Sequence, residues 1–449
     1  MLKTPRFFEK TLHLVSLGCT KNLVDSEVML GRLRDYKIIE DYTQADVIII
    51  NTCGFIQSAK EESIGMILQM AQGKKEGALI VASGCLTQRY KEELQELIPE
   101  IDIITGVGDY DKIDLMIESK KGIASQRVFL ADESKERIIT GSNLHAYIKI
   151  SEGCNQSCSF CSIPSFKGKL QSRSIESILQ EIEMLCGRGY QDFTFIAQDS
   201  SSFLRDKGRS DGLIELIKAV DKQALAKSAR ILYLYPTTTT LELIKTIADS
   251  KIFQNYFDMP IQHISDAMFK RMKRGANAKK HKELLQAMRA VEESFVRSTI
   301  IIGHPQESQE EFDELCDFLE DFVFDRLNIF AFSPEEGTLA HQMEEQIPTK
   351  VINHRIKQVD KIIKKQQKKL LADMVGKTYK VLLEGKSELS EYFYNARVLS
   401  WAPEVDGAIL INDSALEDLT LSNGYYEAQV SEVREDLIFA KVLQKIDCI

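Results

Sequence analysis

The sequence predicts a mixed α/β protein with three domains: an N-terminal open parallel sheet, a central partial barrel of six strand–helix units, and a C-terminal small antiparallel β-barrel. Short apolar runs alternate with amphipathic helical segments up to about residue 370, which is typical of parallel strands joined by crossover helices. Five short strands separated by glycine and acidic turns then follow. We place the domains at residues 9–122, 140–370 and 373–449.

In the first domain, each of three apolar runs ends at a cysteine. Cys19 follows residues 12–18, and Cys53 and Cys85 follow two similar runs, at intervals close to one strand–helix unit. A single cysteine at a strand end is usually a small buried hydrophobic residue. Because the carboxyl ends of parallel strands meet at one edge of a sheet, we expect these three thiols to be neighbours at a ligand-binding edge.

A second set of thiols follows the first strand of the central domain. Cys154, Cys158 and Cys161 form a Cys-x3-Cys-x2-Cys loop after the apolar run 146–150. Three thiolates can hold an iron–sulfur cluster by three of its irons and leave the fourth iron open to a reactant. The alternative is a structural zinc site, which commonly uses two Cys-x2-Cys pairs, and the sequence has no second pair.

The rest of the central domain supplies five more strand candidates. They lie at residues 193–197, 231–235, 255–259, 299–302 and 328–332, with helical segments between them. Polar residues at strand ends are candidates for binding a cofactor, and we favour Gln198 and Asp199 over Gln262, His263 and His304. Each of these side chains has an alternative role in capping a loop or satisfying the core.

The charge of the C-terminal domain indicates its kind of partner. Small barrels often bind oligonucleotides, but residues 377–449 contain seven Lys and Arg against thirteen Asp and Glu, a net charge of −6. The whole chain has a formal net charge of −10. This balance would repel phosphate and attract a basic protein, although the lysine-rich helix at 347–371 leaves a nucleic-acid role open.

Composition favours a cytoplasmic protein that does not enter a membrane. No segment approaches the roughly 20 apolar residues of a membrane span, and the first residues lack the apolar core of a secretion signal. Nine cysteines in a chain of this length indicate thiols and metal ligands in a reducing compartment. Cys186, Cys316 and Cys448 follow no pattern and are interpreted as ordinary core or surface thiols.

The two cysteine motifs and the terminal barrel together resemble the radical S-adenosylmethionine methylthiotransferases, over essentially the whole chain. The motif at 16–27, Ser-Leu-Gly-Cys-Thr-Lys-Asn-Leu-Val-Asp-Ser-Glu, resembles the branch that modifies an aspartate of small-subunit ribosomal protein S-twelve. The transfer-RNA branch typically reads Gly-Cys-Gln-Met-Asn at this place. Trp-Ala-Pro-Glu-Val-Asp-Gly at 401–407 fits the first branch, and the terminal barrel is similar to a TRAM domain.

The resemblance implies a division of labour between two [4Fe-4S] clusters. The cluster on Cys154, Cys158 and Cys161 would bind S-adenosylmethionine and cleave it reductively to a 5′-deoxyadenosyl radical. An auxiliary cluster would carry the sulfur, methylated by a second S-adenosylmethionine, and its ligands would be Cys19, Cys53 and Cys85. The radical would remove hydrogen from the β-carbon of the aspartate, which would then capture the methylthio group.

Other consequences of the resemblance concern partners and alternatives. The enzyme would need an electron donor such as flavodoxin or ferredoxin. Gln198 and Asp199, from their place after the second strand, are our candidates for contacting S-adenosylmethionine. Two departures from the family pattern, at 197–201 and 303–308, lie in loops that would hold this cofactor. A transfer-RNA adenosine methylthiotransferase is the alternative, and less favoured is a two-cluster electron carrier, since ordinary ferredoxin clusters use four cysteines each.

Overall fold

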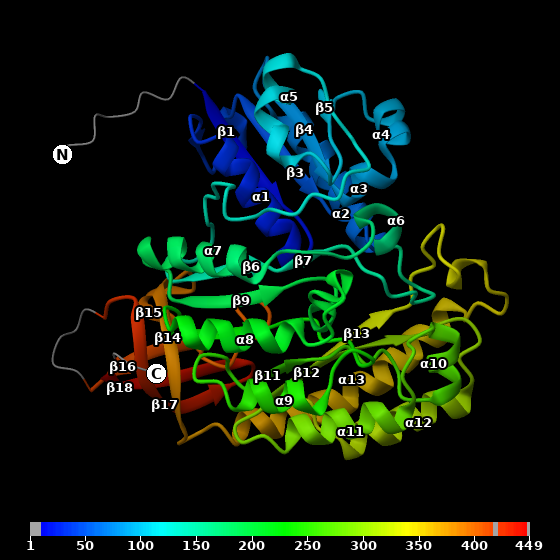
Figure 1. Cartoon of the computed structure of the whole chain (residues 1–449), viewed down its shortest axis with the longest axis vertical. Coiled ribbons are helices and arrows are strands. Elements are labelled where there is room, and N and C mark those ends of the chain that lie inside the picture. Colours follow the sequence, from blue (N-terminus) through cyan, green and yellow to red (C-terminus); the bar gives the residue numbers. More distant parts are fainter. Residues whose placement is uncertain (1–9, 416–420, 447–449) are drawn as a thin grey trace.

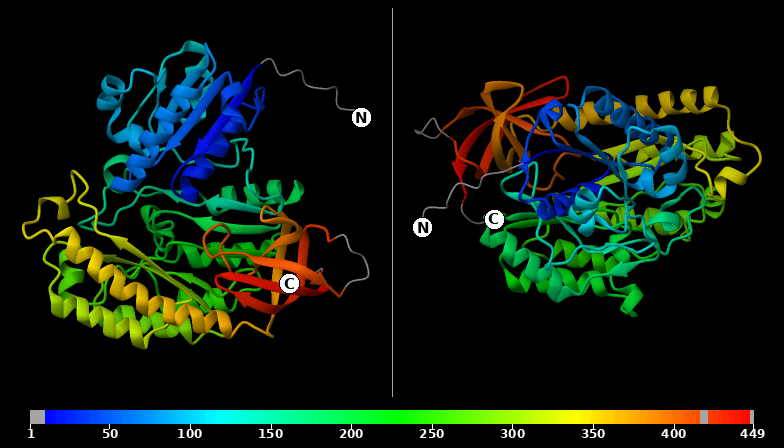
Figure 2. Two further views of the ribbon diagram at one scale, coloured as in Figure 1. Left: turned by 180° about the vertical axis from the view of Figure 1, so that it is seen from behind. Right: turned by 90° about the horizontal axis from the view of Figure 1, so that it is seen from above.

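The three domains are stacked, with the N-terminal sheet across the central domain and the small barrel at one end of it (Figures 1 and 2). The computed structural model describes residues 10–415 and 421–446, so Cys448 and the outermost residues of the first and last predicted domains lie outside it. The predicted fold class is confirmed. No helix in the described ranges has the length and apolar character needed to cross a membrane.

The first domain is a parallel five-stranded sheet in the order β2-β1-β3-β4-β5. Its strands are β1 (Thr11–Ser16), β2 (Lys37–Ile38), β3 (Val47–Thr52), β4 (Leu79–Gly84) and β5 (Ile103–Ile104). Its helices are α1 (Thr20–Arg32), α2 (Gln57–Gly73), α3 (Cys85–Arg89), α4 (Lys91–Leu97) and α5 (Ile113–Ser119). In the central strand β3, Ile49 enters one core while Ile48 and Ile50 enter another, which explains its continuous apolar sequence.

The register of this sheet brings the carboxyl ends of β1, β3 and β4 level. Ser16 lies opposite Asn51, and Asn51 lies opposite Ser83 on the other side. The loops and helices that follow these three strands therefore begin at the same edge, as the alternation of strands and helices predicted.

The central domain has six parallel strands whose order in space follows their order in the chain. One sheet contains β6 (His145–Lys149), β9 (Asp192–Ile196) and β10 (Ser228–Ile231), and the other contains β11 (Tyr256–Asp258), β12 (Phe295–Ile302) and β13 (Arg326–Ala331). A parallel bridge between Ala229 and Phe253 joins the two sheets. The third strand ends earlier than the run 231–235 predicted, because Tyr233 adopts a φ of 65° and turns the chain.

Long helices cover the outer face of this partial barrel, and short elements surround its mouth. The long helices are α7 (Ile175–Gly187), α8 (Gly212–Gln223), α9 (Leu241–Ala248), α11 (Ala278–Arg289), α12 (Gln309–Asp321) and α13 (Thr349–Ala372). The short elements are β7 (Ser151–Glu152), β8 (Gln171–Ser172), α6 (Ile163–Lys167) and α10 (Asp266–Met272). Helix α12 begins with a complete capping box between Ser308 and Glu311.

The third domain is a closed barrel in the order β14-β15-β16-β18-β17. Its strands are β14 (Thr378–Ser387), β15 (Ser390–Val398), β16 (Ile409–Ser414), β17 (Gly424–Arg434) and β18 (Leu437–Lys445). The expectation of a wholly antiparallel barrel was wrong for one pair, since β16 and β18 run parallel. A ring with an odd number of strands cannot alternate direction throughout, so one parallel pair is unavoidable.

The small barrel closes the amino-terminal end of the central strands. Asp192, the first residue of β9, accepts from Arg397 of β15 at 2.6 Å and from Arg230 of β10 at 2.7 Å, and all three side chains are buried. Burial alone would raise the pKa of Asp192, but the two arginines hold it well below its usual range. The loop of Cys154 lies at the opposite, carboxyl end of the central strands, which is where parallel barrels carry their active sites.

We predict that Asp192→Ala destabilises this interface, because it leaves the buried Arg230 without its anion and leaves Arg397 with only Glu384, at 3.7 Å. The expected loss is about 3–5 kcal/mol in the free energy of unfolding. Trp401 is the one tryptophan of the chain and is buried in the core shared by the two domains, so its fluorescence during chemical denaturation measures the effect. Asp413→Ala, which removes an exposed pair with Lys441, is the control, and equal midpoints for the two variants would contradict the prediction.

Candidate active site

The first three cysteines, which we call the N-terminal thiol set, gather at one edge of the N-terminal sheet. Cys19 directly precedes α1, Cys53 directly follows β3, and Cys85 is the first residue of α3. Burial raises the pKa of the Cys85 thiol to about 12. The charge of Lys167 lowers this pKa, and the neighbouring thiols of Cys19 and Cys53 raise it. The three thiols therefore lie within electrostatic reach of one another, as the sequence predicted.

Glycines let these loops approach each other closely. Gly18 has a φ of +83°, and a Cβ at this position would lie 2.8 Å from Sγ of Cys53. A Cβ on Gly54 would lie 2.6 Å from Cα of Leu86, next to Cys85. No larger residue fits at either position without moving a cysteine loop.

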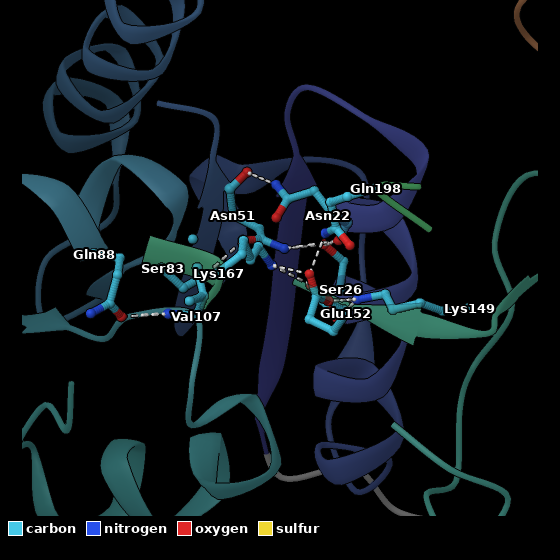
Figure 3. Close-up of polar contacts among 12 residues, drawn as sticks. Asn22, Ser26, Asn51, Ser83, Gln88, Val107, Lys149, Glu152, Lys167 and Gln198 are labelled. Carbon is cyan, nitrogen blue, oxygen red and sulfur yellow. Dashed lines mark hydrogen bonds and ion pairs between the residues drawn. The ribbon is translucent and has the colours of Figure 1, made fainter. Parts of the chain in front are cut away.

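A buried network of amide and hydroxyl groups joins the start of α1 to the end of β3 (Figure 3). Nδ2 of Asn22 donates to the carbonyls of Leu17 at 2.8 Å and Asn51 at 3.1 Å. Nδ2 of Asn51 donates in return to the carbonyl of Asn22 at 3.0 Å and to Oγ of Ser26 at 2.8 Å. The start of α1 and the end of β3 are thus fixed to one another, and with them Cys19 and Cys53.

The other three cysteines, which we call the loop thiol set, lie at the carboxyl end of the central strands. The loop is anchored by Ser159, whose amide donates to the carbonyl of Met272 at 3.0 Å and whose Oγ lies 3.0 Å from Nε2 of His304. Sγ of Cys158 lies 3.5 Å from the hydroxyl of Tyr235 and 3.5 Å from Nη1 of Arg274. Groups that follow β10, α10 and β12 therefore position one loop.

The donor set fits iron–sulfur clusters. Burial raises the pKa of both Cys154 and Cys161 to about 12, so these thiols would ionise only when a metal replaces the proton. Throughout residues 10–415 and 421–446, no three His, Cys, Asp or Glu side chains are close enough to bind a single metal ion. Soft thiolates alone, three at each place, are the ligands that hold an iron–sulfur cube by three corners.

The strand-end candidates for cofactor binding have partners within the protein. Asp199 accepts from Ser202 at 2.6 Å and from Nε2 of Gln156, in the cysteine loop, at 2.8 Å. Gln198 donates to Glu152, and its Oε1 is buried without a partner in the described part of the chain. Contact of Gln198 and Asp199 with S-adenosylmethionine stays a prediction, whereas the hydrogen bonds shown here order the loop around Cys154.

The two histidines that the sequence singled out lie in different parts of the central domain. His304 touches the cysteine loop through Ser159, and burial lowers its pKa to about 4, so it is neutral there. His263 lies 3.5 Å from Glu307, which pairs with Arg355 at 2.6 Å, and Gln262 precedes it with a φ of 70°. His263 thus belongs to a buried ion cluster between β11 and α13.

A buried network of four charges joins the N-terminal domain to the central domain (Figure 3). Lys149 pairs with Asp25 of α1 and, at 2.8 Å, with Glu152, while Lys167 lies 3.3 Å from Asp25 and 3.6 Å from Glu152. All four side chains are at most 7% exposed. Burial disfavours the ionised carboxylate of Glu152, yet the two lysines lower its pKa.

The sequence interpretation missed this four-charge network. The available signal was a lysine and a glutamate within and just after an apolar strand, where charges are rarely buried unless paired. Their partner Asp25 lies in another domain, so spacing along the chain could not pair them.

Three family models match successive parts of the chain. Residues 11–106 match Uncharacterized protein family UPF0004, residues 148–319 match the Radical SAM superfamily, and residues 375–442 match the TRAM domain. Among solved structures, the chain resembles the radical S-adenosylmethionine methyltransferase TsrM from Kitasatospora setae. That likeness has a TM-score of 0.54 at 12% identity and covers 74% of this chain and 73% of the other, so it shows the fold alone.

Curated relatives match nearly the full length. The chain is 58% identical over 436 residues to "Ribosomal protein uS12 methylthiotransferase RimO" of Wolinella succinogenes, covering 97% of this chain and 99% of the relative. It is 62% identical over 434 residues to the protein of the same name from Helicobacter pylori, covering 97% and 98%.

We predict that Gly18→Ala impairs metal binding by the N-terminal thiol set, because the new methyl group would collide with Sγ of Cys53 and strain the backbone. After anaerobic reconstitution, iron per chain should fall toward about half the wild-type value, the share of one of two equal clusters. Gly65→Ala on α2, where no atom lies within 4 Å of the added Cβ, is the matched control. Full iron content in Gly18→Ala would refute the proposed placement.

Proposed function

The chain belongs to the ribosomal protein uS12 methylthiotransferases, and from that premise we propose that it transfers a methylthio group to an aspartate side chain of uS12. The observation that carries this proposal is the buried ion network that joins α1, which Cys19 directly precedes, to the strand that leads to Cys154. Cys154, Cys158 and Cys161 would hold the [4Fe-4S] cluster that binds S-adenosylmethionine. Cys19, Cys53 and Cys85 would hold an auxiliary [4Fe-4S] cluster.

The bound groups supply the one-electron chemistry that an unactivated carbon–hydrogen bond requires, together with the methylthio group that replaces the hydrogen. The residues of the chain position these groups and keep water away. Nη1 of Arg274 donates toward Sγ of Cys158 and stabilises negative charge on that sulfur. The Tyr235 hydroxyl lies 3.5 Å from the same sulfur and donates to the carbonyl of Arg274 at 3.1 Å, which holds Arg274 in place. The four-charge network fixes α1, and with it Cys19, against the strand that leads to Cys154.

The acidic terminal barrel supports a basic protein as the substrate. Its net charge of −6 over residues 377–449 would attract a ribosomal protein and repel a phosphate backbone. This charge and the names of the relatives favour uS12 over transfer RNA. We further propose a cytoplasmic location, where its substrate would be made, and an electron donor such as flavodoxin or ferredoxin.

We predict that the two cysteine sets can be separated by mutation. Cys158→Ala should abolish reductive cleavage of S-adenosylmethionine, measured as 5′-deoxyadenosine. Cys53→Ala should spare cleavage and stop the mass gain on uS12. Cys186→Ala, on α7 away from both sets, should retain both activities. Loss of one and the same activity in both cluster variants would show that the separate roles are wrong.

We also predict that salt slows capture of uS12 by the enzyme. Because screening shortens the range of charge attraction from about 10 Å at 0.1 M to about 3 Å at 1 M, the association rate constant should fall by roughly tenfold or more over that range. Stopped-flow mixing with purified uS12 measures this rate constant. Cleavage of S-adenosylmethionine without uS12 is the control, and a rate constant that does not respond to salt would exclude electrostatic steering.

A further inference from the structure

Lys21 stands out because its ammonium group has an aromatic neighbour and no anion. Its Nζ lies 3.5 Å from the centroid of the Tyr233 ring, and both side chains are partly exposed. Within the described ranges, no carboxylate lies at ion-pair distance from this ammonium group. A cation over an aromatic face keeps its remaining hydrogen-bond donors free for an incoming group.

This pair joins two segments that each lead to one of the thiol sets. Lys21 lies in the first turn of α1, two residues after Cys19. Tyr233 lies just beyond β10, two residues before Tyr235, whose hydroxyl is 3.5 Å from Sγ of Cys158. A substrate that must reach both clusters would therefore pass over Lys21 and Tyr233.

The charges around Lys21 leave it as an excess cation. Asp25 and Glu152 are each shared by Lys149 and Lys167, which balances two anions against two cations. Lys21 is a third lysine beside this network, where Glu152 and Cys19 attract it, and among the described residues no carboxylate forms an ion pair with it. A carboxylate that binds next to Lys21 would neutralise its positive charge, whereas a neutral side chain would not.

The backbone holds the Tyr233 ring in place at an energetic cost. Tyr233 has a φ of 65°, an unusual conformation for a residue with a bulky side chain. Its amide donates to Oδ2 of Asp258 at 3.0 Å, and its carbonyl accepts from the amide of Ser200 at 2.9 Å. Asp258 in turn pairs with Arg297 at 3.2 Å. Strain of this kind persists only where the surrounding structure fixes the residue, as these hydrogen bonds fix Tyr233.

We infer that Lys21, supported by the Tyr233 ring, binds the carboxylate of the substrate aspartate and so selects an acidic side chain. This inference rests on the proposed function and adds the residue that recognises the substrate. An ion pair from Lys21 to the carboxylate would fix the adjacent β-carbon between the two clusters. The ion pair between Lys21 and the carboxylate would thus set the orientation of the carbon–hydrogen bond on the adjacent β-carbon.

The test compares two substrates and three variants of the reconstituted enzyme under anaerobic conditions. The probes are purified uS12 and uS12 with the modified aspartate changed to asparagine. The readouts are equilibrium affinity, iron content and the mass gain on uS12. Wild-type enzyme should prefer the aspartate form by roughly thirtyfold or more. Lys21→Met should bind both forms equally, and Lys21→Glu should prefer the asparagine form. Lys37→Met, which removes an exposed lysine from β2, should keep the wild-type preference.

The outcomes separate this inference from the proposed function. Failure of wild-type enzyme to modify uS12 would overturn both. Modification by wild-type enzyme with an unchanged preference in Lys21→Met would overturn the inference alone. Loss of iron in Lys21→Met and Lys21→Glu would also overturn it, because Lys21 would then serve the cluster rather than the substrate.

Discussion

The buried network of Asp25, Lys149, Glu152 and Lys167 is the contact on which the rest of the site depends. It is the place where a helix of the N-terminal domain meets the first strand of the central domain, and its members are at most 7% exposed. The free energy that is lost when four charged groups leave water offsets most of the free energy gained from their attraction. Such a network therefore fixes a geometry more than it adds stability. In this protein the specified geometry fixes α1, which Cys19 directly precedes, against β6, which leads to the loop of Cys154.

The two ends of the central strands have separate tasks. The amino-terminal end is closed by the small barrel through Asp192, Arg230 and Arg397, and the carboxyl-terminal end carries the loop thiol set. Parallel barrels place chemistry at the carboxyl ends of their strands, where loops can vary without disturbing the core. The small barrel, whose net charge is negative, thus supports the central domain at the end away from the loop thiol set.

The features of the fold that depend on local sequence could be predicted. Continuous apolar runs indicated buried parallel strands, and the cysteines after them indicated a shared edge, which the level ends of β1, β3 and β4 explain. The features that depend on contacts between domains could not be predicted. Asp25 and Lys149 are far apart in sequence, and no spacing rule pairs them. The turn at Tyr233 was also missed, because its apolar neighbours read as a longer strand and its positive φ comes from tertiary hydrogen bonds.

In the proposed arrangement, two incompletely ligated clusters lie on either side of Lys21 and Tyr233. Anomalous diffraction at the iron edge, from crystals of the anaerobically reconstituted protein, would locate both. We expect two separate iron peaks, one against Cys19, Cys53 and Cys85 and the other against Cys154, Cys158 and Cys161. A single iron peak, or a second peak bound to any other residues, would contradict it.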